Sequence, residues 1–413
     1  MEIDSIFTIE KFREARDILK PVLWKTDLIY SSFFSQKSGN HIYIKPENMQ
    51  VTGAYKIRGA YYKISVLSDE LQRAGLITSS AGNHAQGVAY AAQVKGIRAT
   101  IVMPNTTPLM KVNNTKSYGA EVILEGNIFD DAYRYAMDLS TQRGLTFIQP
   151  FDDLDVATGQ GTIAYEIFGN LPDVDVILVP MGGGGLAAGV ASLAKMLNPT
   201  VQVIGVEPRG AACISASRKV GHTVTLDKVD TIADGVAVQT PGAVVFPFIQ
   251  KNIDDVILID DDELIDSFLD MMENHKMVVE NAGLLSIAAL KHLHFQNKNV
   301  VSVLSGGNMD VITMSSLVSH GLIRRGRIFT FSVLLPDRPG ELCRIAEIVA
   351  SQRGNVIKLE HNQFVSVNRN SAVELRVTLE AFGHEHVDQI LAALQKERYD
   401  PKIVDPKGIT VSM

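Results

Sequence analysis

The sequence predicts an α/β protein built on open parallel sheets, followed by a smaller α+β domain. Up to residue 320, short runs rich in Val, Ile and Leu alternate with helical stretches. Such nearly continuous apolar runs are typical of strands that are covered on both faces of a parallel sheet. Beyond residue 330, the predicted elements follow the order β-α-β-β-α-β, which is typical of a ferredoxin-like domain. A chain of 413 residues has room for two or three such domains.

The elements of the first part follow from these patterns. Residues 1–20 alternate charged with apolar side chains, which predicts an amphipathic helix and not a secretory signal. Two later stretches, 129–144 and 284–293, have helical composition. Six apolar runs are predicted as strands, at 41–48, 97–104, 120–126, 174–180, 201–208 and 299–307.

The composition changes at residues 320–330, where Arg324, Arg325 and Arg327 interrupt the earlier pattern. We therefore expect a first domain over 1–320, a linker over 321–329 and a second domain over 330–413. Within the second domain, the predicted elements are a strand at 329–337, a helix at 338–355, strands at 356–367 and 371–381, a helix at 384–399 and a short strand at 409–412.

The overall composition narrows the class of protein. The net charge of −7 argues against a nucleic-acid binder, which would have an excess of basic residues. The most apolar long stretch, 174–196, contains Asp175, Pro180 and four glycines, so we expect a buried strand, loop and helix and no membrane span. Cys213 and Cys343 alone cannot form a disulfide framework, which fits a reducing cytoplasm.

Two segments far apart in the chain carry the chemistry. Lys56 lies in the segment TGAYKIRGA, where a loop is followed by a helix, and the run 176–179 leads into four glycines, Gly182–Gly185. Consecutive glycine N–H groups, with the start of a helix near Leu186, can bind a phosphate. A lysine amine can condense with an aldehyde, which makes Lys56 a candidate both to hold pyridoxal phosphate and to move a proton. For these tasks its pKa should be lowered by burial.

Two other interpretations remain open at this point. Residues 183–188 also match the dinucleotide pattern G-x-G-x-x-A, with Glu207 where a ribose-binding acid would lie, as in a nicotinamide-dependent oxidoreductase. That interpretation leaves Lys56 and the segments 79–87 and 304–308 unexplained. A non-catalytic amino-acid sensor is the alternative from another class, and the intact lysine segment argues against it.

The segments TGAYKIRGA (52–60), SSAGNHAQG (79–87), PMGGGGLAAG (180–189) and LSGGN (304–308) occur in the order seen in fold-type-II pyridoxal-phosphate enzymes. Over nearly its whole length the chain resembles the threonine dehydratases, or threonine ammonia-lyases, that have one C-terminal ACT domain. The resemblance implies a two-lobed catalytic domain similar to tryptophan synthase β. A smaller lobe, at residues 68–150, would be inserted in the larger one.

The same resemblance assigns roles to individual residues. Tyr55 would lie against the pyridine ring, Asn83 would hydrogen-bond the ring oxygen, and Ser305 would partner the ring nitrogen. Around the substrate we expect Ser80, Ala81, Gly82, His84 and Gly235. Serine racemases place an acid-base serine two residues before the asparagine, where this chain has Ala81, so elimination is favoured over racemisation. Glu207 and Ala211 resemble a cation site for a monovalent or divalent ion. Some relatives have an aspartate where this chain has Cys213, which counts against the divalent ion.

The resemblance also implies the reaction. We expect dehydration and deamination of L-threonine, and less effectively of L-serine, with serine dehydratase or racemase activity as the alternative within the family. The segment LLPDRPGEL (334–342) resembles the start of an ACT domain, which predicts a small-molecule allosteric effector and pairing into a homodimer or homotetramer. The role, in isoleucine biosynthesis or in threonine catabolism, and the effector's identity and sign stay open.

Overall fold

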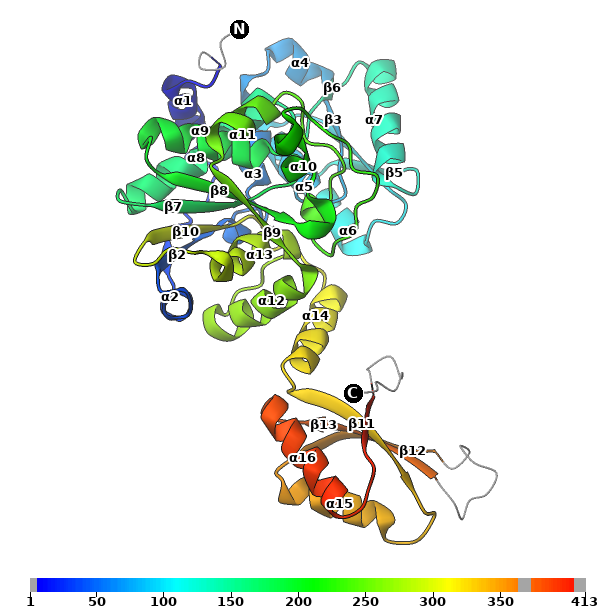
Figure 1. The fold of residues 1–413 in the computed structure, drawn as a ribbon. Helices are drawn as coiled ribbons and strands as arrows, with labels where there is room; N and C mark the ends of the chain where they lie inside the picture. The colour runs from blue at the N-terminus through cyan, green and yellow to red at the C-terminus, as the bar shows by residue number, and fades with distance from the viewer. Residues whose placement is uncertain (1–5, 363–372, 405–413) are drawn as a thin grey trace. The chain divides into compact units, whose positions relative to one another are not determined.

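The computed structural model describes residues 6–362 and 373–404 of the chain. The chain divides into two compact units, Met1–Val311 and Ile312–Met413 (Figure 1). The division lies before the boundary expected at residue 320. The expected linker, 321–329, contains the end of helix α14 (Val311–Arg324) and the start of strand β11 (Ile328–Leu335).

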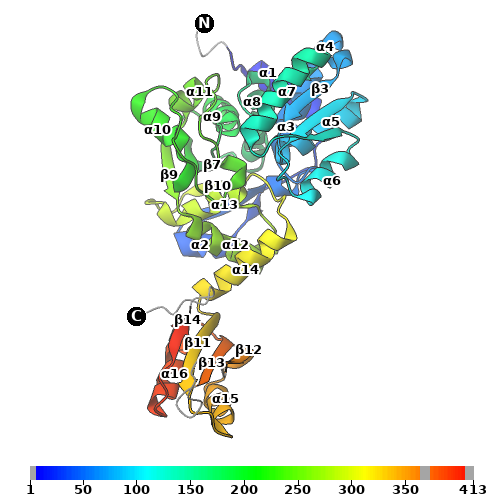
Figure 2. The same ribbon diagram turned by 90° about the vertical axis from the view of Figure 1, so that its right-hand side faces the viewer.

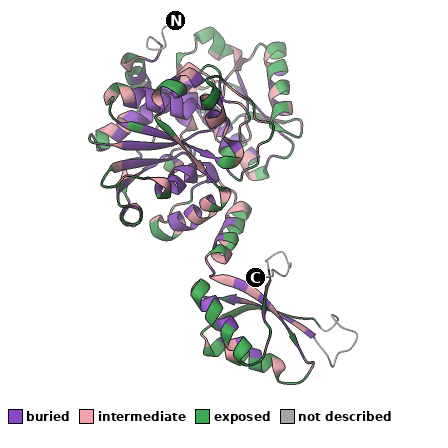
Figure 3. Cartoon of the chain, in the orientation of Figure 1, coloured by how far each residue is buried: buried purple, intermediate pink, exposed green. Residues whose placement is uncertain are grey.

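The larger sheet of the first unit has six strands in the order β1-β2-β10-β7-β8-β9. Its neighbouring strands are parallel except β1 and β2, which are antiparallel. The strands are β1 (Ile29–Tyr30), β2 (His41–Pro46), β7 (Val176–Pro180), β8 (Gln202–Pro208), β9 (Asp255–Ile259) and β10 (Asn299–Leu304). Four of them confirm predicted runs, and the central strands are buried (Figure 3). The core on β7 comes mainly from α8 and α9.

The smaller sheet is parallel, with the order β5-β4-β3-β6. Its strands are β3 (Leu76–Ser79), β4 (Ala99–Met103), β5 (Glu121–Leu124) and β6 (Thr146–Phe147), all within the range 68–150. Ile77 and Val102 pack against helix α7, whereas Leu76 and Ile101 share a core with α5 on the other face (Figure 2). This two-sided burial explains why β4 is recognisable as an apolar run, whereas β5, at the edge of the sheet, is only partly buried.

The helices of the first unit cover both sheets. They are α1 (Ile9–Leu19), α2 (Ser32–Ser38), α3 (Lys56–Val66), α4 (Asp69–Ala74), α5 (Asn83–Lys95), α6 (Leu109–Ser117), α7 (Phe129–Arg143), α8 (Leu154–Asn170), α9 (Gly185–Leu197), α10 (Cys213–Val220), α11 (Phe246–Asn252), α12 (Asp261–His275) and α13 (Asn281–Ala288). Short 3₁₀ turns are η2 (Glu47–Met49), η3 (Arg209–Ala211), η4 (Asp234–Val236) and η5 (Ala289–His292). The predicted helix at 129–144 is α7, and the stretch 284–293 is divided between α13 and η5.

Helix α3 begins at Lys56. Ile57, Ala60 and Ile64 are fully buried in the core that also contains Val88 and Ala92 of α5. This apolar face anchors the helix, so the position of the lysine is set by the packing of the smaller lobe's core.

The second unit confirms the ferredoxin-like order. It contains β11, α15 (Glu341–Ser351), β12 (Asn355–Asn362), β13 (Val373–Glu380), α16 (His384–Lys396) and β14 (Lys402–Val404). The sheet order is β12-β13-β11-β14 and every pair is antiparallel. Alternate residues of β11 and β13 are buried, as expected for a sheet with helices on one face. The strand predicted at 409–412 lies outside the described residues, as do positions 363–372 of the two predicted middle strands.

No helix within the described ranges is both long enough and apolar enough to cross a membrane.

Candidate active site

The candidate active site is a cavity of about 880 Å³ in the first unit. It lies where the carboxyl ends of parallel strands lead into helices: β3 leads toward α5, which begins at Asn83, and β7 leads toward α9, which begins at Gly185. Lys56, at the start of α3, also lines the cavity. Helix N-termini carry a partial positive charge, and this edge of a parallel sheet is where α/β proteins bind ligands. The cavity therefore suits an anionic ligand.

Most residues predicted for the site line this one cavity. They come from segments that are far apart in the sequence, and Glu207 and Ala211 are the two exceptions. The lining includes Tyr55, Lys56, Ser80, Ala81, Gly82, Asn83, His84, Gly182, Gly183, Gly184, Gly185, Leu186, Gly235 and Ser305.

Lys56 has the environment of a reactive amine. Its Nζ donates a hydrogen bond to the carbonyl oxygen of Pro150 at 2.7 Å and lies 5.5 Å from the centre of the Tyr55 ring. Burial lowers the pKa of Lys56 to about 8, although the nearby Glu280 carboxyl acts in the opposite direction. A lower pKa leaves more of the amine neutral near pH 7, and the neutral amine is the nucleophile.

The glycine loop after β7 brings bare backbone to the cavity. Gly184 has a φ of +100°, in the left-handed region that favours glycine, and it caps the N-terminus of α9. A Cβ at Gly184 would overlap the Cδ1 of Ile249, and one at Gly183 would overlap the ring of Phe151. Only glycine lets the chain pass through this space, so the main chain itself lines the cavity. The loop and the start of α9 together form a cradle that fits a phosphate group.

The segment between β3 and α5 supplies polar groups without protein partners. Ser79 and His84 are buried, and among the described residues neither the Oγ of Ser79 nor the Nδ1 of His84 has a hydrogen-bond partner. The Nε2 of His84 lies 3.2 Å from the carbonyl oxygen of Ile148. Burial, with the neighbouring Lys56, lowers the pKa of His84 to about 3, so the ring is neutral at pH 7. Both residues line the cavity, and buried polar atoms in proteins normally have a hydrogen-bond partner.

Two further residues at the site were not singled out from the sequence. Glu280 precedes α13, and its Oε1 accepts a hydrogen bond from the Nδ2 of Asn83 at 2.7 Å. Burial, helped by the charge of Asp234, raises the pKa of Glu280 to about 8. Asn308 donates from its Nδ2 to the Oδ1 of Asn83 at 2.8 Å. A signal for Glu280 does exist in the sequence, since this glutamate interrupts the apolar run from Met277 to Ala289.

Glu207 and Ala211 lie away from the cavity lining. Glu207 is the last but one residue of β8, and its two carboxylate oxygens accept hydrogen bonds from the N–H groups of Ile214 and Ser215, each at 2.8 Å. The carboxylate thus caps α10, which leaves the dinucleotide interpretation without its ribose-binding acid. The cation site at Glu207 and Ala211 stays a prediction; across residues 6–362 and 373–404, no group of three His, Cys, Asp or Glu side chains could hold a metal.

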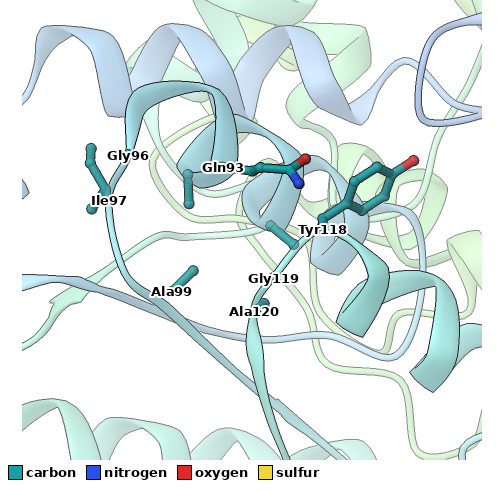
Figure 4. A pocket seen from close by; sticks show the side chains of 9 residues that line it. Gln93, Gly96, Ile97, Ala99, Tyr118, Gly119 and Ala120 are labelled. Carbon is teal, nitrogen blue, oxygen red and sulfur yellow. The ribbon is translucent and has the colours of Figure 1, made fainter.

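A second cavity, of about 210 Å³, is lined by the end of α5 and by the residues before β4 and β5 (Figure 4). Its lining consists of alanines and glycines with Gln93, Ile97 and Tyr118. It has neither an amine nor a glycine cradle, so the chemistry belongs to the larger cavity.

Comparisons with known proteins agree with this geometry. The family described as pyridoxal-phosphate dependent enzymes matches residues 19–306. An L-threonine ammonia-lyase of Thermotoga maritima is 42% identical over 400 residues, which are 97% of this chain and 100% of that protein. The processed form of threonine deaminase isoform 2 from Solanum lycopersicum has a TM-score of 0.72 at 38% identity, covering 76% of this chain and 94% of that one. Maize serine racemase also has a TM-score of 0.72, at 34% identity, covering 76% and 98%.

The matched residues include every residue that lines the cavity except Asn308, so the comparison and the geometry concern the same site. The chain therefore belongs to the family of pyridoxal-phosphate dependent enzymes that includes the L-threonine ammonia-lyases.

Proposed function

We propose that the protein is a pyridoxal-phosphate dependent ammonia-lyase that converts L-threonine to 2-oxobutanoate and ammonium, and L-serine less effectively to pyruvate. The observation that carries this proposal is that the Lys56 amine and the Gly182–Gly185 loop line one cavity. An amine and a phosphate cradle are the two attachments that this cofactor needs. The relatives named L-threonine ammonia-lyase support the choice of threonine.

Pyridoxal phosphate, when bound, withdraws electrons from the substrate Cα and so weakens its C–H bond. Lys56 would hold the cofactor at its aldehyde carbon. Its amine, when free, would take the proton from the substrate Cα, in keeping with its lowered pKa. The N–H groups of Gly182–Gly185 and Leu186, at the start of α9, would hold the phosphate.

Ser305, Tyr55 and Asn83 surround the place of the ring. Ser305 follows β10, and its carbonyl oxygen accepts a hydrogen bond from the Tyr55 N–H at 3.0 Å, which brings the two residues together. The Ser305 hydroxyl would partner the ring nitrogen without fixing a positive charge there, because a hydroxyl is not an anion. This favours the departure of a β-hydroxyl over a long-lived carbanion.

Ser80, Gly82 and His84 would face the substrate carboxylate, and Gly235 would line the substrate side through its backbone. Ala81 has no group that can donate or accept a proton. The second face of the substrate Cα therefore lacks an acid at this position, which favours elimination over racemisation. This residue separates the proposal from the activity of the serine racemase that shares the fold.

The second unit is proposed to be an ACT domain that binds a small allosteric effector and pairs in a homodimer or homotetramer. Its ferredoxin-like topology supports the assignment, as does the turn between β11 and α15, where Gly340 has a φ of +96°. A reducing cytoplasm suits two cysteines that are both free, Cys213 and the exposed Cys343.

The test measures 2-oxo acid release from L-threonine, L-serine and other amino acids by the full chain, with and without isoleucine, valine and nucleotides. We expect the highest kcat/KM for L-threonine and a response to at least one effector. Conversion of L-serine to D-serine at a rate above 2-oxo acid release would contradict the proposal. The variant Ala81→Ser should gain racemisation, whereas the neighbouring Ser80→Ala control should not.

A further inference from the structure

We propose that Asn308 and Glu280 are positioning residues that fix the amide of Asn83, so that Asn83 presents an N–H to the ring oxygen of the bound cofactor. The inference rests on the proposed function, because it needs the cofactor ring in the cavity. It adds two residues, 197 and 225 positions from Asn83 in sequence, that act through the asparagine.

The orientation of the Asn308 amide is set by the backbone. Its Nδ2 donates to the carbonyl oxygen of Thr52 at 2.7 Å and to the Oδ1 of Asn83 at 2.8 Å. A carbonyl oxygen can only accept, so the nitrogen of Asn308 must face Thr52. The loops that carry the two residues are held together, since the Gly307 N–H donates to the carbonyl oxygen of Gly53 at 2.9 Å.

The orientation of Asn83 follows from that of Asn308. Since its Oδ1 receives the Asn308 N–H, its Nδ2 must face Glu280, where one hydrogen goes to the Oε1 at 2.7 Å. An amide nitrogen carries two hydrogens, and Asn83 lines the cavity. The second hydrogen is left for the ligand. Asn83 is therefore a donor toward the ligand, because its acceptor atom, Oδ1, faces Asn308.

Gly306, the first glycine of the SGGN segment, leaves room for the same chain of hydrogen bonds. A Cβ on Gly306 would overlap the Oε1 of Glu280 and would lie 2.9 Å from the Nδ2 of Asn83. The Glu280 N–H also donates to the carbonyl oxygen of Gly306 at 3.0 Å. The hydrogen bond between Asn83 and Glu280 thus lies against Gly306, where any side chain would displace it.

The charged groups that face Glu280 are Lys56 of α3, Lys111 of α6 and Asp234 of η4. Burial raises the pKa of Glu280 to about 8, so near pH 7 its carboxyl is mostly uncharged and still offers a carbonyl oxygen to Asn83. A donor at the ring oxygen favours the deprotonated form of that oxygen, whereas an inverted amide would favour the protonated form. The chain of hydrogen bonds therefore sets the protonation state of the cofactor ring.

The test compares Asn308→Leu with Asn281→Leu in the holoenzyme. Leucine has a similar volume but no donor, so Asn83 loses the bond that fixes its orientation. Asn281 is a matched control, because it is buried beside Glu280 and its Nδ2 donates to the carbonyl oxygen of Ile232 at 2.8 Å without contacting Asn83. Two readouts besides activity are the pH titration of the cofactor's visible absorbance and the dissociation constant of pyridoxal phosphate.

We expect Asn308→Leu to raise the titration midpoint and to raise the dissociation constant about tenfold, the worth of one hydrogen bond to a charged group. Asn281→Leu should match the parent protein in both. Equal titrations and equal dissociation constants for the two variants would overturn the proposal. If Asn308→Leu does not fold, Glu280→Ala and Glu280→Gln decide, since both remove the carboxyl but only glutamine keeps an acceptor for Asn83.

Glu280→Ala should then shift the titration while Glu280→Gln stays with the parent, and identical behaviour of the two would overturn the proposal. The outcomes distinguish a failure of the proposed function from a failure of the positioning role. A parent protein that binds no pyridoxal phosphate refutes the proposed function, whereas a parent that binds it with variants that all titrate alike refutes only the positioning role.

Discussion

Two clusters of largely buried ionisable groups flank the first turn of helix α3, and they differ in whether these groups form ion pairs. The first contains Lys45, Glu47, Arg58 and Glu166; the second contains Lys56, His84 and Glu280. In the first, Arg58 is fully buried, and its guanidinium contacts Glu47 at 2.7 Å and Glu166 at 2.6 Å. Lys45 bridges the same two carboxylates. In the second cluster, the Lys56 amine bonds to a neutral carbonyl group.

Whether a buried group has a partner of opposite charge decides the direction in which its pKa moves. Burial alone would raise the pKa of Glu47, but the charges of Arg58 and Lys45 outweigh it and lower that pKa to about 2. In the second cluster, burial lowers the pKa of Lys56 to about 8 and raises that of Glu280 to about 8. Paired charges hold the structure, whereas unpaired groups are poised to exchange protons. Two residues of one helix, Lys56 and Arg58, thus serve opposite purposes.

The largest effect is expected from a substitution that removes the lysine of the second cluster and leaves the first cluster intact. Lys56→Ala should lower kcat for L-threonine by about 10⁴-fold or more, since the cofactor attachment and the proton-moving group are lost together. The free energy of unfolding of the cofactor-free protein should not fall, because a poorly solvated amine has been removed. Activity assays and urea unfolding check the two halves. Turnover at the parent rate would refute the role of Lys56.

Breaking the first cluster should have the reverse outcome. Arg58→Met leaves Glu47 buried without its main partner and should lower the free energy of unfolding by about 3–5 kcal/mol. Denaturant unfolding measures this loss, and the double variant Glu47→Gln, Arg58→Met should recover part of it because no carboxylate is then left unpaired. Arg58→Met with the stability of the parent would show that the network does not hold α3.

The pH dependence of stability sharpens the comparison. Glu280 keeps its proton in the folded protein up to about pH 8, whereas the unfolded chain ionises near 4.5, so its contribution to stability is lost as the pH rises through this window. Glutamine cannot ionise. The unfolding free energy of cofactor-free Glu280→Gln, relative to the parent, should therefore increase by about 1.4 kcal/mol per pH unit between these values.

Glu47 gives the opposite sign and serves as the contrast. Its folded pKa, about 2, lies below its ordinary value of 4.5, so its contribution is present above pH 4.5 and is lost as the pH falls toward 2.

A constant stability difference between Glu280→Gln and the parent from pH 5 to 8 would contradict the assignment of Glu280 to the unpaired class.

The smallest effect concerns the ion pair at the edge of the cavity. Lys111 of α6 lies 2.9 Å from Asp234 of η4, but the Asp234 side chain is 67% exposed. Exposed pairs contribute at most about 1 kcal/mol. Lys111→Ala should change the KM for L-threonine by less than about fivefold and should leave Tm nearly unchanged. A change beyond a hundredfold in kcat would place Lys111 in the reaction itself.

The sequence predicts the parts of the fold and site whose signals are local. The strands β2, β4, β5, β7, β8 and β10 are apolar runs, and the glycine loop and Lys56 belong to recognisable segments. The two-residue strands β1 and β6 are too short for a periodic pattern. The bond between Asn83 and Glu280 joins residues 197 positions apart, so it depends on how the two lobes pack and not on any local pattern. The division at Val311 falls at the start of a helix, α14, where composition does not change.

The most direct test of the central claim is to reduce the purified protein with borohydride, digest it and locate the attached group by mass spectrometry. Reduction makes the link between an amine and pyridoxal phosphate permanent, so the modified peptide identifies the amine. We predict a single pyridoxyl-phosphate adduct on the peptide that contains Lys56, with none on neighbouring Lys63. An adduct on another lysine, or a cofactor-loaded protein whose Lys56 peptide is unmodified after reduction, would contradict the account.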